Sequence, residues 1–380
     1  MKKYIPLFLF SAVMCGSSAT HAMSTPFSLY ERMKNNLSEK YNINYNLDYS
    51  LMVQRTSPNG KSNAVQSYFS PSISWTTFNN RYGTGILNAS YNSIFYGNHN
   101  AQDLQNRSGF VTDINDFNEE QQSFSGLYYT YQLPGQYNWL TIGAGQYTLY
   151  AFDGNDYNND QQQTFINYAL AQNASATYAD AGLGAYVQAT PGNWLFAAGL
   201  QDATNIEAAS IRFNHLNDKH YTTFGQIGYN PQLKWGKGQY SVLIYNQPYV
   251  KEQPQSTTGW SVNIQQNLGE KMALFGRING ASGHMVSIKN SYVAGVALNN
   301  PLNRNSLDQI GLAYAYNDID ETAVGEKIGR KAEQIIETYW AWGLSSYATI
   351  TPDLQFYIHP AQNPKSDYGT AVSLRMSVFF

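Results

Sequence analysis

From about residue 41 to the end of the chain, apolar and polar side chains alternate with a period of two. The clearest case is the last segment, residues 370–380, in which Leu374 and Met376 are separated by Arg375. Residues 334–346 and 350–358 repeat this alternation. A strand with such a pattern has one face toward an apolar medium and the other toward a polar one.

About sixteen segments follow this pattern, and most have the roughly 9–11 residues that a tilted strand needs to cross a bilayer. Hydrocarbon offers no hydrogen-bond partner, so every strand edge must be paired and the sheet must close. We therefore predict an all-β fold, a closed transmembrane antiparallel β-barrel of about 16 strands. A soluble β-sandwich or propeller would not require a lipid-facing stripe on each strand. The predicted strands are 41–54, 66–78, 82–96, 123–133, 138–149, 179–190, 193–202, 221–231, 238–248, 257–267, 271–279, 291–298, 307–318, 334–346, 349–359 and 370–380.

The connections between these segments alternate between short and long. Tight periplasmic turns and longer outer loops are typical of outer-membrane barrels, and an even strand count places both termini in the periplasm. The short links are 79–81, 134–137, 191–192 and 267–270, and the long links are 97–122, 150–178, 203–220, 280–290, 319–333 and 360–369.

Residues 1–22 have the features of a secretory signal peptide. Lys2 and Lys3 precede an apolar stretch, and small residues lead to a cleavage site after Ala22. The single cysteine, Cys15, lies in this segment, where lipid attachment is the alternative interpretation. Residues 23–40 are predicted to form a periplasmic segment with a short amphipathic helix, packed on the barrel or bound to a partner. Residues 41–380 are then the barrel.

Composition and charge exclude several other classes of protein. Disordered chains combine high net charge with few aromatic residues, whereas this chain has a formal net charge of −3 and 15% aromatic residues. It has no 18-residue apolar run of the kind that forms a membrane helix. No basic face indicates a nucleic-acid partner.

Local motifs give no indication of catalysis. The six histidines form no His-Glu-x-x-His pair, and no Gly-x-Ser-x-Gly turn is present. We therefore expect no enzymatic activity, no cofactor and no metal site. An outer-membrane hydrolase, built from residues distant in sequence, stays open as an alternative.

Alternation places several charged and aromatic side chains on the lumen face of the predicted barrel. An arginine on the lipid face would cost roughly 2–4 kcal/mol, which supports the assignment of the faces. Carboxylate, guanidinium and aromatic groups together suit sugars, since hydroxyls donate and accept hydrogen bonds. A structural ladder that braces the wall is the alternative role. The lumen candidates are Arg277, Glu337, Asp353, Gln355, Tyr357 and Arg375.

Three stretches of the chain resemble the carbohydrate-selective porin family (OprB type). The first runs from 333 to 340 and continues through Pro352-Asp353-x-Gln355 to a closing Leu-Arg strand that ends in Phe380. The others are the Leu-Phe-Gly-Arg sequence ending at Arg277 and the region 145–167. The resemblance covers roughly 125–380, and the family's acidic-Trp-Gly-Gly opening is absent. It implies a monomer-sized pore of sixteen strands that admits sugars by diffusion.

The segment 153–160 has three possible roles. Its oxygen-rich side chains could suit calcium, but Tyr157 and Asn158 break the EF-hand pattern at positions five and six. A plain polar turn is the second interpretation. The third follows from the resemblance and the length of the loop and is preferred to calcium: the loop folds inward and narrows the pore. The constriction candidates are Asp153, Asp156, Tyr157 and Asp160.

The sequence therefore predicts a porin in the outer membrane of a Gram-negative bacterium, with passive and sugar-preferring diffusion. A porin for an organic anion or amino acid is the nearest alternative. A barrel plugged by its own loops is a further one. Expected partners are small sugars, outer-membrane lipid and the barrel-assembly machinery, for which Phe380 is the predicted signal. Monomer and homotrimer both stay open.

Overall fold

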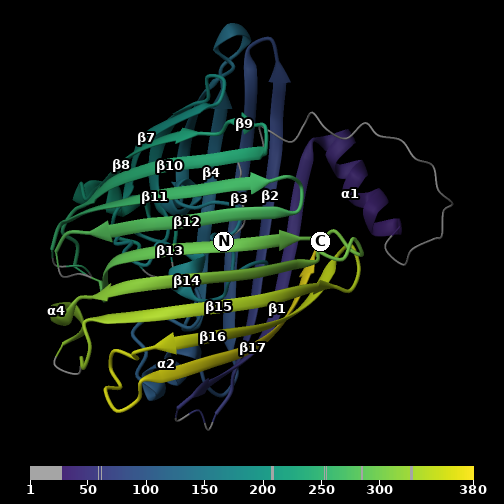
Figure 1. Cartoon of the computed structure of the whole chain (residues 1–380). Helices are drawn as coiled ribbons and strands as arrows, with labels where there is room; N and C mark the ends of the chain where they lie inside the picture. The colour runs from purple at the N-terminus through teal and green to yellow at the C-terminus, as the bar shows by residue number, and fades with distance from the viewer. Residues whose placement is uncertain are drawn as a thin grey trace.

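The computed structural model describes residues 28–380 except 59, 61, 207–208, 252, 254, 284–285 and 326–327. Sixteen long strands form a closed antiparallel barrel (Figure 1). Each pairs with the next along the chain, and β17 pairs with β1 to close the sheet. The predicted fold is confirmed, and each predicted segment corresponds to one of these strands. The signal peptide predicted for residues 1–22 lies outside the described residues.

The strands are β1 (Ile43–Ser57), β2 (Ala64–Asn80), β3 (Gly83–Tyr96), β4 (Gln121–Gln132), β5 (Leu140–Tyr147), β6 (Gly182–Ala189), β7 (Trp194–Asp202), β8 (Tyr221–Tyr229), β9 (Gln232–Leu233), β10 (Gly236–Gln247), β11 (Thr257–Leu268), β12 (Met272–Ala281), β13 (Ile288–Asn299), β14 (Gln309–Ile319), β15 (Ala332–Gly343), β16 (Ala348–Ile358) and β17 (Tyr368–Phe379). The two-residue β9 pairs only with the start of β10, inside a turn. The helices are α1 (Ser28–Tyr41), α2 (Ala101–Ser108), α3 (Tyr168–Ala171) and α4 (Glu321–Val324). Among the described residues, no helix is long and apolar enough to cross a membrane.

The two faces of each strand differ as the alternation predicts. On β1, the outward side chains of Tyr49, Leu51 and Val53 are about two-fifths exposed, whereas inward Ser50 and Gln54 are buried. The outward side chains form the apolar surface that a barrel presents to lipid. Many of the inward ones are polar and face the lumen or the loops within it, although inward Met52 on the same strand is apolar and buried.

Short and long connections alternate around the barrel, and they define its two ends. The end that carries the connections after β2, β4, β6, β8, β11, β13 and β15 is called here the short-turn end, and the opposite end is the long-loop end. The alternation is not strict, however. The turn 300–308 is longer than the loop 282–287 at the opposite end.

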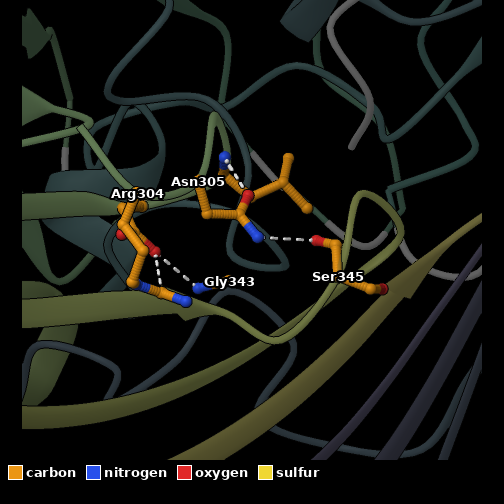
Figure 2. Close-up of polar contacts among 6 residues, drawn as sticks. Arg304, Asn305, Gly343 and Ser345 are labelled. Carbon is orange, nitrogen blue, oxygen red and sulfur yellow. Dashed lines mark hydrogen bonds and ion pairs between the residues drawn. The ribbon is translucent and has the colours of Figure 1, made fainter. Parts of the chain in front are cut away.

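The long turn 300–308 is fastened to the next turn along the rim (Figure 2). The buried carboxylate of Asp308 accepts hydrogen bonds from Gly343 N (2.8 Å) and Arg304 Nη2 (2.5 Å). Asn305 Nδ2 donates to Ser345 O (3.1 Å). A Cβ at Gly343 would lie 2.4 Å from Asn305 Cγ, so any larger residue there would displace the Asn305 side chain. The extra residues thus join two turns instead of forming a free loop.

The N-terminal helix and the C-terminus meet at the short-turn end (Figure 1). The predicted N-terminal amphipathic helix forms as α1 and ends just before β1 begins. The last residue continues the ladder that closes the barrel, since Leu47 N donates to Phe380 O (2.7 Å) and Phe380 N donates to Leu47 O (3.1 Å). The Phe380 ring lies 5.4 Å from the Tyr30 ring of α1, edge to face. The terminal aromatic side chain therefore covers the point where the sheet closes.

Phe380→Ser should reduce the amount of folded barrel in the outer membrane. The backbone hydrogen bonds to Leu47 do not depend on the side chain, so a lower folded yield would measure the contribution of the aromatic ring. Heat-modifiable mobility of outer-membrane fractions measures the folded yield. Phe379→Ser, on the lumen side of β17, is the matched control and should assemble normally. Equal folded yields for both variants would contradict the role of Phe380 in assembly.

Candidate functional site

Two of the long loops fold into the lumen instead of standing above it. The loop 97–120 lies against inward glutamine side chains: Gln66 donates to Phe117 O (2.9 Å), and Gln54 and Gln355 donate to Ile114 O (3.3 and 2.9 Å). The loop 148–181 lies beside it and begins earlier than predicted, because β5 ends at Tyr147. Together these two loops fill one side of the barrel.

Glu333 on β15 holds the loop 97–120. Its buried carboxylate accepts hydrogen bonds from the backbone N–H groups of Val111 (3.1 Å) and Thr112 (2.8 Å), and from Ala361 N (2.9 Å) in another loop. The sequence interpretation missed this residue. Glu333 lies four positions before Glu337, so the period of two places both side chains on the same face of the strand. This signal could have identified it.

Glu337 holds the loop 148–181 in the same way. Its carboxylate accepts from Ile166 N (2.6 Å) and Asn167 N (3.1 Å). The Asn167 side chain then donates to Tyr357 Oη (2.7 Å) and Gln355 Oε1 (3.2 Å). A carboxylate that accepts backbone N–H groups makes stronger hydrogen bonds than a neutral acceptor would.

The two predicted lumen arginines also contact this loop. Arg375 on β17 donates to the carbonyls of Thr164 (2.9 Å) and Gln161. Arg277 on β12 donates to Asn158 O (2.6 Å). Asp353 lies on the same inward face of β16 and is buried. All six predicted lumen residues thus face inward, and five of them contact the loops directly. Their predicted role in solute binding stays a prediction.

The predicted constriction residues lie in the part of the loop 148–181 nearest β11 and β12. Asp153 is buried and accepts from Asn173 Nδ2 and Asn263 Nδ2, both at 2.8 Å. Asp160 accepts from Gln162 N (2.8 Å) within its own turn. Amide donors therefore occupy both carboxylates. Within the part of the chain that the structure describes, no group of three or more His, Cys, Asp or Glu side chains could hold a metal ion.

Of the other two constriction candidates, Tyr157 is buried and Asp156 is partly exposed. Tyr157 stacks on Phe275 with ring centres 5.6 Å apart, and its hydroxyl accepts from Asn299 (2.8 Å). Asp156 is half-buried, and one of its carboxylate oxygens accepts from Gln265 Nε2 (3.1 Å). Of the four candidates, Asp156 alone lines the cavity described next.

A cavity of about 260 Å³ lies on the side of the lumen that the loops leave open. Its wall combines the lumen faces of β1–β8 and β10 with the first part of the loop 148–181. Among its lining residues, only Asp156 and Lys237 are charged. Sequence reasoning did not identify the wall, because single amide and hydroxyl side chains carry no motif. Its polar and aromatic lining includes Asn44, Asn88, Ser90, Ser125, Tyr128, Thr130, Tyr150, Tyr186, Gln188, Gln226 and Gln239.

A closed barrel of sixteen strands with loops folded into its lumen is the architecture of a porin. A family model described as the carbohydrate-selective porin, OprB family, matches residues 214–380. Porin AaxA of Chlamydia felis (strain Fe/C-56) is 41% identical over 343 residues, which cover 88% of this chain and 77% of that protein. Porin AaxA of Chlamydia pneumoniae is 38% identical over 349 residues, covering 89% and 79%. This chain belongs to the OprB family of porins.

Solved structures agree on the fold. The high-pH structure of Pseudomonas putida OprB superposes with a TM-score of 0.74 at 13% sequence identity, covering 92% of this chain and 97% of that one. OmpF of Salmonella typhi gives a TM-score of 0.58 at 9% identity, covering 89% and 97%. The family and the barrel together point to the outer membrane and to a channel rather than an enzyme.

The inward loop 97–120 contains a carboxyl group that titrates near physiological pH. Burial raises the pKa of Asp113 to about 6, although Gln105 of α2 donates a hydrogen bond to it (2.6 Å). The neighbouring charges of Asp116 and Glu119 raise this pKa further. The folded loop therefore keeps the Asp113 proton at a pH where an unfolded chain would release it.

Acidification should tighten the loop 97–120. Since the folded pKa of Asp113 lies above the ordinary value of 3.8 for this carboxyl, its contribution to stability falls as pH rises from about 3.8 to about 6. Hydrogen exchange in this loop, corrected for the intrinsic rate, should be slower at about pH 5 than at about pH 7.5. Asp113→Asn keeps an oxygen acceptor for Gln105 and should remove most of this difference. An unchanged pH dependence in the variant would contradict the assignment.

Glu337→Ala should release the loop 148–181. Two backbone N–H groups would lose a charged acceptor, and each buried unpaired donor costs about 1–3 kcal/mol. We expect faster proteolysis within 148–181 and a noisier, larger single-channel current. Glu333→Ala is the matched variant and should expose the loop 97–120 instead. The same cleavage pattern in both variants would show that the two carboxylates do not act on separate loops.

Proposed function

We propose that this protein is a passive diffusion channel of the outer membrane that prefers sugars, with its short turns and both termini in the periplasm. The observation that carries the proposal is the wall of the cavity, which is almost entirely neutral and rich in hydrogen-bonding groups. The channel needs neither a cofactor nor an energy source, because its solutes move down their own gradients.

The chemistry of the wall suits hydroxyl-rich solutes. Amide and hydroxyl side chains such as Asn88 and Ser90 donate and accept hydrogen bonds, as sugar hydroxyls do. The rings of Tyr128 and Tyr186 add flat apolar surfaces against which sugar C–H groups can pack. A wall of this kind holds a neutral polar solute weakly enough for it to leave again.

The buried lumen residues have a different part in this proposal. Glu333, Glu337 and Arg375 hold the loops in place, and the loops leave only one side of the lumen open. The size of solute that can pass then depends on these three residues, and the chemical preference depends on the cavity wall. In this proposal the predicted lumen residues affect solute passage indirectly, by holding the loops in position.

A porin for amino acids is the second candidate. The cavity wall carries one carboxylate, Asp156, and one ammonium group, Lys237. These two charges match the opposite charges of a zwitterion. An organic anion would be attracted by Lys237 and repelled by Asp156, so the pair gives it no clear advantage.

Single-channel recording in planar bilayers tests this proposal. A disaccharide should reduce the open current saturably. Asn88→Ala should weaken this effect by about threefold to tenfold, as expected for one lost hydrogen bond. Tyr128→Ala should also weaken it, because the ring surface is lost. Asn138→Ala, in an exposed turn outside the cavity, is the matched control.

The same recordings distinguish the two candidates. If neutral amino acids block the current, sugars do not, and Asp156→Asn or Lys237→Gln removes the block, then the second candidate replaces the first. A folded protein without any current would contradict both.

A further inference from the structure

The helix α1 rests on the barrel rim, where Tyr30 and Lys34 contact the lipid-facing side and Ser38 Oγ donates to the inward Asn44 Oδ1 (2.9 Å). Its Tyr30 ring lies 6.3 Å from the ring of Tyr45 and 5.4 Å from that of Phe380, both edge to face. Lys34 Nζ lies 5.4 Å from the centre of the Tyr45 ring. Tyr45 shares its face of β1 with Leu47, Tyr49 and Leu51, which is the face that points to lipid.

One face of α1 is apolar and exposed. Leu29 and Met33 are 64% and 57% exposed, and Leu37 continues the row at the same spacing of four residues. Residues spaced by four lie one above the other on a helix. We call Leu29, Met33 and Leu37 the apolar row. The barrel leaves Leu29 and Met33 uncovered, whereas Leu37, at the end of the row, is half-buried.

The opposite face of α1 is polar. Glu31, Asn35 and Glu39 form a second row with the same spacing, about 160° around the helix from the apolar row on an ideal wheel of 3.6 residues per turn. Arg32 lies beside the apolar row and Lys40 continues it at the C-terminal end of the helix, and both are positively charged. A narrow apolar face bordered by basic side chains is typical of helices that lie in a membrane interface.

We propose that α1 lies in the phospholipid headgroup layer at the short-turn end of the barrel. The apolar row contacts the outer part of the acyl chains, and Arg32 and Lys40 reach the lipid phosphates. Tyr30 joins α1 to the outward face of the barrel near β1 and the C-terminus, so the lipid-facing surface is continuous with the helix. A phospholipid leaflet therefore extends naturally from the barrel wall onto the apolar row. In the proposed orientation this is the periplasmic leaflet.

Fluorescence quenching with a single attached probe tests this placement. In a Cys15→Ser background an introduced cysteine is the only one in the chain. An environment-sensitive fluorophore is attached at Met33→Cys in the apolar row, or at Asn35→Cys in the polar row as the matched position. Leu51→Cys, on the outward face of β1, is the lipid-exposed reference. Each variant is reconstituted in vesicles of phosphatidylethanolamine and phosphatidylglycerol, and heat-modifiable mobility verifies that the barrel has folded.

Brominated acyl chains should quench the probe at position 33 by about twofold, as expected for a helix buried to the depth of the acyl boundary, and should leave position 35 nearly unchanged. Aqueous iodide should show the reverse preference. Equal iodide quenching at 33 and 35, without a bromolipid effect, would place α1 in water and overturn the proposal. A blue-shifted probe at 33 that neither quencher reaches would also overturn it, because another protein surface would then cover the apolar row.

Discussion

The need to pair every backbone N–H and C=O group within hydrocarbon governs this structure. A sheet with two free edges would leave the outward N–H and C=O groups of its first and last strands unpaired in lipid. The pairing of β1 with β17 removes both edges, and its ladder continues to the final residue through the two hydrogen bonds between Leu47 and Phe380. Once the sheet is closed, outward side chains must be apolar and inward ones are free to be polar.

The interior of the barrel follows from that freedom. Loops inside the lumen need partners for their own backbone groups, and the strands supply them as carboxylates, amides and arginines. Glu333 and Glu337 accept backbone N–H groups, whereas Arg277 and Arg375 donate to backbone carbonyls. The same wall therefore needs both negatively charged acceptors and positively charged donors. This explains why the charges of the lumen are mixed and why most of them lie beneath the loops.

The strands could be predicted from the sequence because a period of two is a local property of each strand. The facing of Arg375 and Glu337 followed directly from it. The loop contacts have no such local signal, since Ile166 and Glu337 are separated by 171 positions. Glu333, which the sequence interpretation missed, differs from the identified loop-binding residues only in the loop that it contacts. The alternation of link lengths failed at 300–308, where the contacts of Asp308 with Gly343 depend on the neighbouring turn.

The inward loop 148–181 also has a mechanical consequence. At one point it is bonded to β17 through Ser377 Oγ (2.7 Å to Gln162 O), and at another to β11 through Asn263 (2.8 Å to Asp153). β17 and β11 lie far apart around the barrel, so the loop connects two distant parts of the wall across the lumen. Hydrogen bonds to two distant strands tie these parts of the wall together across the lumen. The width of the opening beside the loop is then set by bonds inside the protein and not by the pressure of the surrounding lipid.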